Sequence, residues 1–452
     1  MMQNIILIGL PGSGKSTLGA RAAEIMNLDF LDLDTEIESR AGLTIPEIFE
    51  QFGEEYFRSL EIMAMRQSLT GQGRLIAAGG GVVTRRENIA ALKDGGCVIF
   101  LDRPVEKIME SIIDDDRRPL LRGGPARLLE LSGERRELYL AAADLSLPNQ
   151  GGEDEGLAKL LAVIRAETVA DGYGVIGDPI AHSLSPAIHE AVFKSIGCDS
   201  PYRTFLVPPS RLAYFVDRVR RSDVLGFNIT IPHKRTIMPL LDEIDEEARP
   251  AGAVNTVVHH NGRLTGFNTD MDGLQASLRD HGSDFESRNA LILGAGGAAG
   301  GIAFKAVRSR AKRVAILARR LDQAEEAAER ARLYSGAKVR TGLLAPEIMA
   351  QEAAKADLLI NCTPLGMQGV AVDFESFDFL DQLPPKAVVC DLIYKPAMTN
   401  LLLEAEKRGL TILNGLGMLI HQAILADERF LNRKLDRAGL YQKVISALAR
   451  TA

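Results

Sequence analysis

Two glycine-rich segments with different residue patterns stand far apart in this 452-residue chain. The first, Gly9-Leu-Pro-Gly-Ser-Gly14-Lys15-Ser16-Thr17, has the form G-x-x-x-x-G-K-[ST]. In such a loop the backbone N–H groups and the lysine bind a polyphosphate, and the hydroxyl binds Mg²⁺. We therefore expect Lys15 to neutralise phosphate oxygens and Ser16 to hold Mg²⁺ during phosphoryl transfer. The predicted ATP-binding residues of this loop are Gly12, Ser13, Gly14, Lys15, Ser16 and Thr17.

The second segment, Gly294-Ala-Gly296-Gly297-Ala-Ala-Gly300, follows the apolar run 290–293. A turn of this kind brings bare backbone and a helix N-terminus to the pyrophosphate of a dinucleotide. The next apolar run, 313–317, is followed by Ala318-Arg319-Arg320, where NAD-binding chains carry an acidic residue. Arginine there suits the 2′-phosphate of NADP, although a solvated arginine pair at a strand end has the same pattern. Hydride transfer with NADP is the chemistry that this segment favours.

Further polar residues are suited to binding a small polar acid, although each also has an ordinary structural explanation. Asp32 and Asp34 end an apolar run, and doubly wound folds bind ligands at strand C-termini, but either aspartate could be a helix N-cap. Ser183 and Ser185 could together bind a carboxylate, but serines at this spacing are also common in turns and caps. Lys234, taken alone, is typical of a surface lysine at a helix start.

The N-terminal third alternates short apolar runs with amphipathic helical patterns, which is typical of buried parallel strands joined by helices. The predicted strands are 4–8, 28–33, 75–78 and 97–101. Residues 148–156 are expected to form a turn and helix start, and 157–166 a closing helix. The fold class is therefore α/β, with parallel sheets and right-handed crossovers.

The remainder of the chain starts a new strand at Tyr173, after a junction around 167–172. Short strands and helices continue to about 272, and strand–helix units opening with the second glycine turn occupy about 288–413. From Asn414 the pattern is helical, and such tails often pack back on an earlier domain. The expected domains are 1–168, 172–272 together with 414–452, and 273–413.

Composition narrows the class of protein. The net charge of −7 gives no support for nucleic-acid binding, which usually requires a basic patch. The four cysteines are scattered without a C-x-x-C pair, which favours reduced thiols in a cytoplasmic protein over disulfides or a zinc site. We expect no signal peptide and no membrane span. Small-molecule substrates are the expected partners, and oligomerisation is possible but not indicated.

The N-terminal third resembles shikimate kinase over essentially residues 1–166. The ordered segments that carry the resemblance are 9–17, Asp32 and Asp34, Phe57-Arg58-Ser-Leu-Glu61, Gly79-Gly80-Gly81, Arg118-Pro-Leu-Leu121 and Glu134-Arg135-Arg-Glu-Leu-Tyr139. The resemblance implies a P-loop kinase domain that uses ATP and Mg²⁺, and it gives these residues specific roles.

By this resemblance, Asp34 binds ring hydroxyls, and Arg58 and Arg135 hold the substrate carboxylate. Gly79, Gly80 and Gly81 supply close backbone contact to the substrate. Arg118, from a mobile lid, closes onto the phosphates, and the register leaves Arg117 as an alternative. Asp32 is expected either to hold a Mg²⁺-bound water or to orient the reacting hydroxyl. Arginine forks suit a small anionic acid because they bind a carboxylate with two parallel hydrogen bonds.

Two positions depart from the family pattern. The usual proline before Leu-Tyr is Glu137 here, beside Arg135 and Arg136. The lid segment carries three acids, 114–116, just before its arginines. Neither change removes a reacting group.

The part of the chain from about 172 to 452 resembles shikimate dehydrogenase. The ordered segments that carry the resemblance are 174–189, Gly226-Phe-Asn228-Ile-Thr230-Ile-Pro-His-Lys234, Gly252-Ala-Val-Asn255-Thr256, Gly266-Phe-Asn268-Thr269-Asp270, the glycine turn, Asn361-Cys-Thr363-Pro-Leu-Gly-Met367, Asp391-Leu-Ile-Tyr394 and 414–422. The resemblance implies a substrate-binding domain and a Rossmann NADP-binding domain.

By this resemblance, Ser183 and Ser185 bind the substrate carboxylate, and Lys234 and Asp270 form the catalytic pair. The other residues implied for the substrate site are Asn228, Thr230, Asn255, Tyr394 and Gln422. The cofactor site is implied at Gly294, Ala295, Gly296, Gly297, Ala298, Arg319, Thr363, Met367 and Gly415. Ala318 stands where the family often has asparagine, which could weaken adenosine contacts.

The lysine–aspartate pair fits reduction of a ketone, because the alkoxide left by hydride addition needs a proton from a positioned acid. His182, His189, His233 and His421 show no metal-site spacing, and we expect them to be ordinary hydrogen-bonding histidines.

Together the two resemblances predict a bifunctional enzyme of aromatic amino-acid biosynthesis. It would reduce 3-dehydroshikimate to shikimate with NADPH and phosphorylate shikimate at the 3-hydroxyl with ATP. Two alternatives remain. One is a regulator that senses shikimate or quinate without turnover, which should have lost reacting groups. The other is an NAD-dependent quinate/shikimate dehydrogenase, which the arginine pair and the kinase half disfavour.

Overall fold

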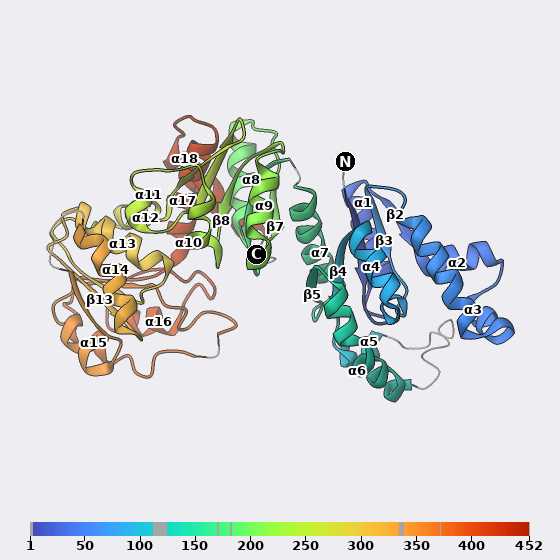
Figure 1. Ribbon diagram of the computed structural model, residues 1–452. Helices are drawn as coiled ribbons and strands as arrows, with labels where there is room; N and C mark the ends of the chain where they lie inside the picture. Colours follow the sequence, from blue (N-terminus) through green and yellow to red (C-terminus); the bar gives the residue numbers. More distant parts are fainter. Residues whose placement is uncertain are drawn as a thin grey trace. The chain divides into compact units, whose positions relative to one another are not determined.

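The computed structural model describes residues 3–111, 124–169, 171–180, 183–333, 339–370 and 372–451. The chain forms two compact units, Met1–Thr168 and Val169–Ala452. The first runs from blue to teal in Figure 1 and the second from green to red. Each unit has its own sheets and its own hydrophobic core.

The described part of the N-terminal unit contains a five-stranded parallel sheet. In spatial order its strands are β2 (Asp29–Asp32), β3 (Arg74–Ala77), β1 (Asn4–Ile8), β4 (Gly96–Asp102) and β5 (Leu145–Pro148). Every residue of the central strand β1 is buried, as expected for a parallel sheet covered on both faces. The predicted strand 28–33 is shorter, because Leu33 already belongs to the next helix.

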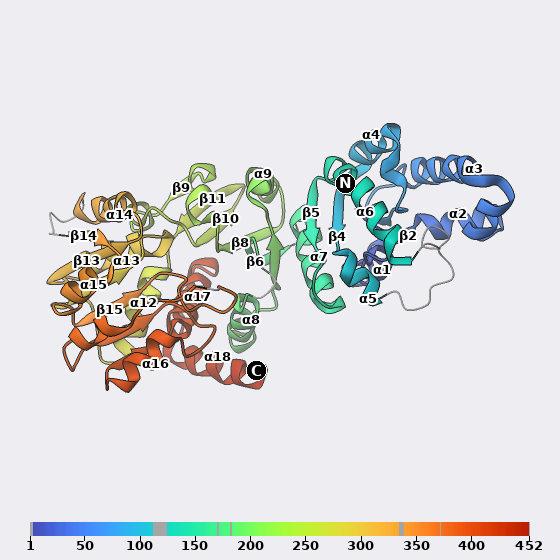
Figure 2. The same ribbon diagram turned by 90° about the horizontal axis from the view of Figure 1, so that it is seen from below.

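Helices cover this sheet and project beyond it. They are α1 (Lys15–Met26), α2 (Leu33–Ala41), α3 (Ile45–Ser68), η1 (Val82–Thr84), α4 (Arg86–Gly95), α5 (Val105–Ser111), α6 (Gly124–Ala142) and α7 (Glu153–Thr168). Figures 1 and 2 show α2 and α3 side by side, extending away from the sheet. Helix α3 begins with a capping box in which Thr44 and Glu47 satisfy each other's backbone N–H groups.

The C-terminal unit contains a mixed sheet, whereas parallel sheets were expected throughout. Its strands, in spatial order, are β7 (Tyr202–Leu206), β6 (Gly172–Gly177), β8 (Val224–Ile229), β10 (Thr256–His260), β11 (Arg263–Phe267) and β9 (Glu243–Ile244). Strand β10 is antiparallel to β8 and β11. The β10–β11 hairpin turns at Asn261 and Gly262, both with positive φ (50° and 78°), as a two-residue Asn-Gly turn requires.

A second sheet of this unit is parallel throughout. Its strands, in spatial order, are β14 (Val339–Leu343), β13 (Arg313–Ala318), β12 (Asn289–Leu293), β15 (Leu358–Asn361), β16 (Val388–Asp391) and β17 (Thr411–Leu413). The order reverses direction between β12 and β15, and doubly wound folds bind ligands at the strand carboxyl ends beside such a switch point.

The helices of this unit connect and cover the two sheets. They are α8 (Ser185–Ile196), η3 (Pro209–Arg211), α9 (Leu212–Val219), α10 (His233–Thr236), η4 (Met238–Leu240), α11 (Ala248–Ala251), α12 (Asp270–Asp280), α13 (Gly297–Arg308), α14 (Leu321–Leu333), α15 (Pro346–Ala353), η5 (Asp378–Gln382), α16 (Asn400–Lys407), α17 (Gly415–Phe430) and α18 (Arg437–Thr451).

The helical tail predicted from Asn414 is present. Asn414 caps α17 by accepting a hydrogen bond from the Leu416 N–H. Both tail helices contact α8, and α17 also packs along α12. Chain segments more than 200 residues apart therefore pack together around the mixed sheet. Among the described helices, none combines the length and apolarity that a bilayer crossing demands.

Candidate active sites

The phosphate loop lies between β1 and α1, in the order that its sequence predicts. Gly12 and Gly14 have φ values of 80° and 97°, which are strained for any residue with a Cβ. The amino group of Lys15 donates to the carbonyl oxygens of Gly9 and Leu10, each at 2.9 Å. Ser16 and Thr17 are exposed at the start of α1. The loop thus has the bare backbone, the cation and the accessible hydroxyl that a polyphosphate site needs.

Asp32 caps α2. Its Oδ1 accepts from the N–H groups of Asp34 and Thr35 at 3.0 and 3.3 Å. The cap explains why the strand stops at Asp32 and the helix starts at Leu33. Asp34 lies in the first turn of that helix, and its Oδ1 would be 3.0 Å from a Cβ placed on Gly79.

The glycine trio 79–81 lies between the phosphate loop and a group of charged side chains. A Cβ on Gly80 would lie 3.0 Å from Pro11 of the phosphate loop, and one on Gly81 would lie 2.0 Å from Arg58 Nη1. No larger residue fits at these positions without displacing its neighbours. The trio therefore brings the phosphate loop, Asp34 and Arg58 close to one segment of backbone.

Arg58 is paired with Glu61, a residue that lay inside the quoted segment but was given no role. The two side chains are three residues apart on α3, so they share one face, and Arg58 Nη1 donates to Glu61 at 2.9 Å. Glu61 is 1% exposed, and burial raises its pKa although Arg58 opposes the rise. Its other oxygen would be 2.8 Å from a Cβ on Gly79. A buried carboxylate thus holds Arg58 beside the trio.

Arg135 and Tyr139 hold Gly80 from the other side. Arg135 Nη1 donates to the Gly80 carbonyl at 3.0 Å, and the Tyr139 hydroxyl donates to the same oxygen at 2.5 Å. Tyr139 is fully buried, and burial raises its pKa to about 12, so it remains a donor at neutral pH. The four-residue spacing on α6 places both groups on one helix face.

Other predicted kinase features lie elsewhere. Arg118, its alternative Arg117 and the acids 114–116 are outside the described residues. Arg136 pairs with Asp102 at 2.6 Å, and Glu137 is exposed.

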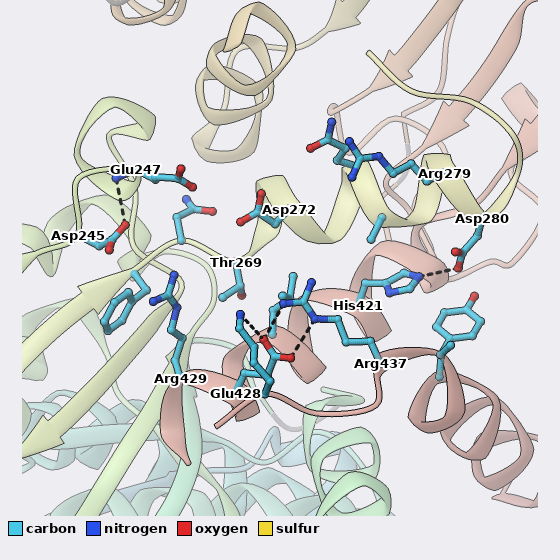
Figure 3. A pocket seen from close by; sticks show the side chains of 18 of the residues that line it. Asp245, Glu247, Thr269, Asp272, Arg279, Asp280, His421, Glu428, Arg429 and Arg437 are labelled. Carbon is cyan, nitrogen blue, oxygen red and sulfur yellow. Dashed lines mark hydrogen bonds and ion pairs between the residues drawn. The ribbon is translucent and has the colours of Figure 1, made fainter. Parts of the chain in front are cut away.

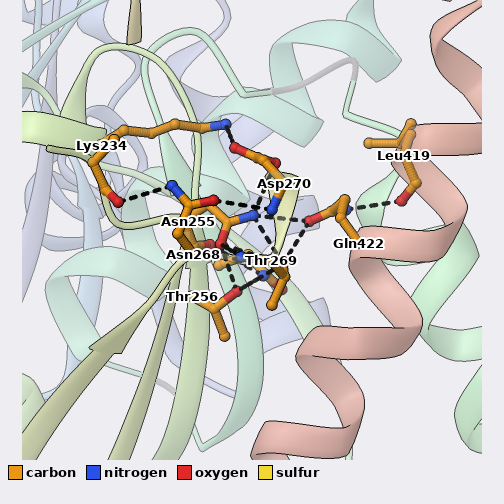
Figure 4. A network of polar contacts seen from close by, with 10 residues as sticks. Lys234, Asn255, Thr256, Asn268, Thr269, Asp270, Leu419 and Gln422 are labelled. Atoms are coloured by element: carbon orange, nitrogen blue, oxygen red, sulfur yellow. Dashed lines mark hydrogen bonds and ion pairs between the residues drawn. The ribbon is translucent and has the colours of Figure 1, made fainter. Parts of the chain in front are cut away.

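In the C-terminal unit, Lys234 and Asp270 meet although they are far apart in sequence (Figure 4). Lys234 Nζ lies 2.6 Å from Asp270 Oδ2, and their side chains are 23% and 10% exposed. Lys234 lies on the short helix α10, and Asp270 is the first residue of α12. A carboxylate at a helix N-terminus is stabilised by the helix dipole. The pair is partly shielded from water yet still accessible.

Asn255 is the centre of the network behind this pair (Figure 4). Its Nδ2 donates to Asp270 Oδ1 at 2.9 Å, to Thr269 Oγ1 at 3.0 Å and to Gln422 Oε1 at 3.1 Å. Its Oδ1 accepts from the Thr269 N–H and the Thr256 hydroxyl. The network joins β10, α12 and α17, and it fixes the orientation of Asp270.

Asn228 extends the network on β8. It is 5% exposed, and its Nδ2 donates to the Asn255 carbonyl at 3.2 Å and to Thr256 Oγ1 at 3.0 Å. Its Oδ1 accepts from the Tyr202 hydroxyl at 2.7 Å. Tyr202 was not singled out in the sequence.

The remaining predicted substrate residues lie on loops and element ends. Ser185 starts α8, and its N–H donates to Ser183 Oγ at 3.2 Å, so the Ser183 hydroxyl lies at the first turn of this helix. Thr230 follows β8 directly, and its Cγ2 would be 2.4 Å from a Cβ on Gly177. Tyr394 is half-buried, and burial raises its pKa.

The second glycine turn has the geometry of a dinucleotide site. Gly294 has φ of 100°, and a Cβ there would lie 3.1 Å from Thr363 Cγ2. Gly296 and Gly297 are exposed, and a Cβ on either would meet nothing within 4 Å. Helix α13 starts at Gly297 without a side-chain cap, so no side chain competes with an anion for the N–H groups at this end of the helix.

Thr363 is held by a buried pair, Asn361 and Asp391, which lay inside the quoted segments but were given no role. Asn361 Oδ1 accepts from the Thr363 N–H at 3.0 Å and from its hydroxyl at 2.7 Å. Asn361 Nδ2 donates to Asp391 Oδ1 at 3.0 Å. Both residues end adjacent parallel strands, and each is fully buried. Their positions at the ends of two apolar runs were the sequence signal that could have identified them.

Three residues predicted for the cofactor site differ in their exposure to solvent. Arg319 follows β13 and is exposed, and Met367 is 40% exposed. Gly415 is buried, and a Cβ there would lie 2.0 Å from the Leu392 carbonyl oxygen, so close backbone packing already requires glycine.

A cavity of about 870 Å³ runs along α12 and α17, and no residue predicted for either site lines it (Figure 3). Several of its charged side chains are paired with one another. Arg437 contacts Glu428 at 2.7 Å, and His421 lies 2.7 Å from Asp280. The predicted chemistry therefore lies outside this cavity.

The other described histidines that were considered as ligands also have hydrogen-bonding partners. His189 Nδ1 lies 2.6 Å from Asp427 Oδ1, and His233 Nε2 lies 2.6 Å from the Val207 carbonyl oxygen. His182 is outside the described residues.

Comparisons with known proteins agree with this division of the chain. Residues 11–165 match the family model of shikimate kinase, and residues 175–257 match that of the shikimate dehydrogenase substrate binding domain. The shikimate dehydrogenase (NADP(+)) of Symbiobacterium thermophilum is 42% identical over 264 residues, which cover 58% of this chain and 89% of that protein. The enzyme of the same name from Methanopyrus kandleri is 42% identical over 277 residues, covering 61% of this chain and 95% of that protein.

Solved structures give the same result. A shikimate dehydrogenase in complex with NADP+ aligns with a TM-score of 0.56 at 35% identity, over 62% of this chain and 96% of its own. Shikimate 5-dehydrogenase from Thermus thermophilus, in complex with shikimate, aligns with a TM-score of 0.53 at 32% identity, over 62% of this chain and all of its own.

Proposed function

This chain belongs to the shikimate dehydrogenase family and carries a shikimate kinase domain ahead of it, and we propose that it converts 3-dehydroshikimate to shikimate 3-phosphate in two steps. The C-terminal unit reduces the ketone with NADPH, and the N-terminal unit phosphorylates the hydroxyl that this reduction creates. The observation that carries the proposal is the Lys234–Asp270 contact at 2.6 Å, within the Asn255 network.

In the reduction, NADPH supplies the hydride when it is bound. Lys234 donates a proton to the substrate oxygen as negative charge develops on it, which is the contribution expected of a general acid. Asp270 orients the Lys234 ammonium and stabilises its charge. Ser183 and Ser185 bind the substrate carboxylate, and the bond from the Ser185 N–H to Ser183 Oγ, which keeps the two residues together, supports this role.

The substrate hydroxyls are assigned to the polar groups around Asp270. Asn228, Asn255 and Gln422 form one hydrogen-bonded set, which holds each amide in a fixed orientation. Thr230 and Tyr394 complete the proposed substrate site.

The NADP site is assigned to the glycine turn 294–298 and to Arg319. The open space in front of Gly296 and Gly297 fits a pyrophosphate, because α13 offers uncapped N–H groups there. The exposed guanidinium of Arg319 suits the 2′-phosphate. We assign the rest of the cofactor to Thr363, Met367 and Gly415.

In the phosphorylation, ATP with Mg²⁺ supplies the transferred group and neutralises its charge when bound. Lys15 exchanges its contacts with the loop carbonyls for phosphate oxygens. Ser16 and Asp32 are the proposed metal residues, since their oxygens are the hard donors that Mg²⁺ prefers. Gly12, Ser13, Gly14 and Thr17 complete the proposed nucleotide site, together with Arg118.

Shikimate is assigned to the space beside the glycine trio. Arg58 and Arg135 flank Gly79–Gly81 and provide two guanidinium groups for one carboxylate. We assign the ring hydroxyls to Asp34, and its exposure beside Gly79 supports this assignment.

We assign residues 1–168 to the kinase domain, 172–272 with 414–452 to the dehydrogenase substrate-binding domain, and 273–413 to the NADP-binding domain. The mixed sheet and the α8–α17 packing support joining the C-terminal tail to the substrate-binding domain.

The test is a single reaction containing 3-dehydroshikimate, NADPH and MgATP, followed by NADPH absorbance and product mass. Shikimate 3-phosphate should form only when both cofactors are present. Lys15→Ala should abolish phosphorylation and spare NADPH oxidation, whereas Lys234→Ala should slow NADPH oxidation about 10²–10⁴-fold and spare phosphorylation. Each variant is the matched control for the other. Loss of both activities in either folded variant, or no turnover by the wild type, would refute the proposal.

A further inference from the structure

A buried tyrosine lies behind two residues of the proposed dehydrogenase substrate site. Tyr202 is 3% exposed on β7, and its hydroxyl donates to Asn228 Oδ1 at 2.7 Å. The Ser185 side chain lies beside the same phenol. Burial raises the pKa of Tyr202 well above its usual value, although the neighbouring Ser185 side chain opposes the rise. One neutral hydroxyl therefore bonds to a group on β8 and faces a group on α8.

The ring of Tyr202 is held by a buried histidine that contacts a buried aspartate. His189 stacks on it with 4.0 Å between ring centroids and 7° between planes. His189 Nδ1 lies 2.6 Å from Asp427 Oδ1, and both side chains are fully buried. Burial raises the pKa of Asp427, and His189 opposes the rise.

The positions of these residues along their helices link them to the site. His189 follows Ser185 by four residues on α8, so both lie on one helix face. Asp427 lies on α17, the helix that also carries Gln422. The His189–Asp427 contact therefore links α8, which supplies Ser185, to α17, which supplies Gln422. Tyr202 stacks on the histidine of this contact.

We propose that Tyr202 is a positioning residue of the dehydrogenase site: its hydroxyl fixes the Ser185 side chain and the Asn228 amide in the orientation that binds a ring acid through its carboxylate. This inference rests on the proposed function, because it takes Ser185 and Asn228 to be substrate ligands. The stacked His189–Asp427 pair keeps the Tyr202 ring in place and does not touch substrate.

Tyr202 is expected to affect substrate binding because the two proposed ligand side chains, Ser185 and Asn228, can rotate. A serine hydroxyl rotates freely and an asparagine amide can turn over, so each loses binding energy unless a neighbour selects one orientation. Asn228 already donates to Asn255 and Thr256, and Tyr202 is the donor for its oxygen. Without that phenol, a buried acceptor is left unpaired, and the orientation of the amide depends on its two donated bonds alone.

Tyr173 provides a matched control. It is the register partner of Tyr202 on the neighbouring strand β6, and it is 4% exposed. Its hydroxyl donates to the Phe430 carbonyl at 3.4 Å, and its ring packs against Phe193 and Phe430. Tyr173→Phe thus removes a buried phenol from the same sheet while leaving the contacts of Ser185 and Asn228 intact.

The experiment compares Tyr202→Phe and Tyr173→Phe in the full chain, by steady-state oxidation of shikimate with NADP+. Tyr202→Phe should raise KM for shikimate about tenfold, as expected when a buried acceptor loses its donor. Its kcat should stay within about threefold, and KM for NADP+ and the kinase rate should not change. Tyr173→Phe should match the wild type. An unchanged KM in Tyr202→Phe, or equal losses in the two variants, would overturn the inference.

A double-mutant cycle with Ser185→Ala tests whether Tyr202→Phe changes KM by acting through Ser185. If Tyr202 acts through Ser185, the effect of Tyr202→Phe on KM should shrink at least about threefold in the Ser185→Ala background. Effects that simply add would overturn the inference even if Tyr202→Phe alone weakens binding. Failure of the wild-type chain to oxidise shikimate would refute the proposed function itself, whereas normal wild-type turnover with either contrary result would refute this inference alone.

Discussion

Asp391 offers a quantitative test of how burial controls charge in the C-terminal unit. It ends β16, is fully buried and supports Asn361 behind Thr363. Burial raises its pKa from about 3.8 to about 6, although hydrogen bonds from Thr399, the Ile393 N–H and Asn361 oppose the rise. We predict that Asp391→Asn changes the pH dependence of stability in this unit.

The magnitude follows from linkage between protonation and folding. The shift of about two pKa units corresponds to about 3 kcal/mol between the protonated and ionised forms. Because the folded pKa is the higher one, the folded state binds the proton more tightly. The stabilisation is therefore complete below about pH 4 and is lost as the pH rises through about 6. Integration from pH 5 to pH 7.5 gives a loss of about 1.4 kcal/mol from this carboxyl.

The assay is urea unfolding of the wild type and Asp391→Asn at about pH 5 and about pH 7.5, followed by circular dichroism. Loss of shikimate oxidation identifies the transition of the C-terminal unit. Other titrating groups cancel in the difference between the two proteins, so the variant should gain about 1.4 kcal/mol on the wild type between the two pH values. Asp378→Asn, at an exposed position in the same unit, should show no such gain. A difference between Asp391→Asn and wild type that is equal at both pH values would refute the reasoning.

Three further predictions concern single side chains. Arg319→Ala should raise KM for NADPH about tenfold or more and leave KM for NADH unchanged, because a charge-assisted hydrogen bond to the 2′-phosphate is lost; initial rates with both cofactors check this. Glu61→Ala should destabilise the N-terminal unit by about 3 kcal/mol, since the buried Arg58 guanidinium loses its buried partner; urea unfolding measures the change, and a loss below about 1 kcal/mol would contradict it. Tyr139→Phe should raise KM for shikimate phosphorylation several-fold, because the Gly80 carbonyl loses one of its two donors; an unchanged KM would count against this role.

Much of the fold could be predicted because a buried parallel strand is encoded by a short, continuous apolar run. The run 4–8 is a strand from Asn4 to Ile8, since five consecutive apolar or buried positions suit only the centre of a covered sheet. The mixed sheet was missed for a specific reason. His260-Asn261-Gly262-Arg263 joins two short strands through a two-residue Asn-Gly turn, which is itself a sequence signal for an antiparallel hairpin. The prediction of parallel sheets did not take this Asn-Gly turn into account.

The candidate sites were predictable only where short motifs place reacting groups. The phosphate loop and the glycine turn are local, because their glycines, lysine and helix starts are within a few residues of one another. Glu61, Tyr139 and Tyr202 were not assigned roles, because buried polar residues are recognised by their partners. Tyr139 reaches Gly80, 59 residues earlier in the chain. No local spacing encodes such a contact.

The proposed catalytic lysine shows why a motif and its tertiary contacts must be considered together. Lys234 lies on α10, which spans only His233–Thr236. A single helical turn is unstable alone, because nucleation fixes several dihedral angles for one hydrogen bond. Its position is instead set by the Val254 N–H, which donates to the Lys234 carbonyl at 2.8 Å, and by the Nζ contact with Asp270. Asn255, next to Val254, donates to that same Asp270. Two adjacent residues of one segment thus fix both the backbone of the proposed acid and the carboxylate that orients it, so a displacement of residues 254–255 should impair proton transfer without altering either reacting group.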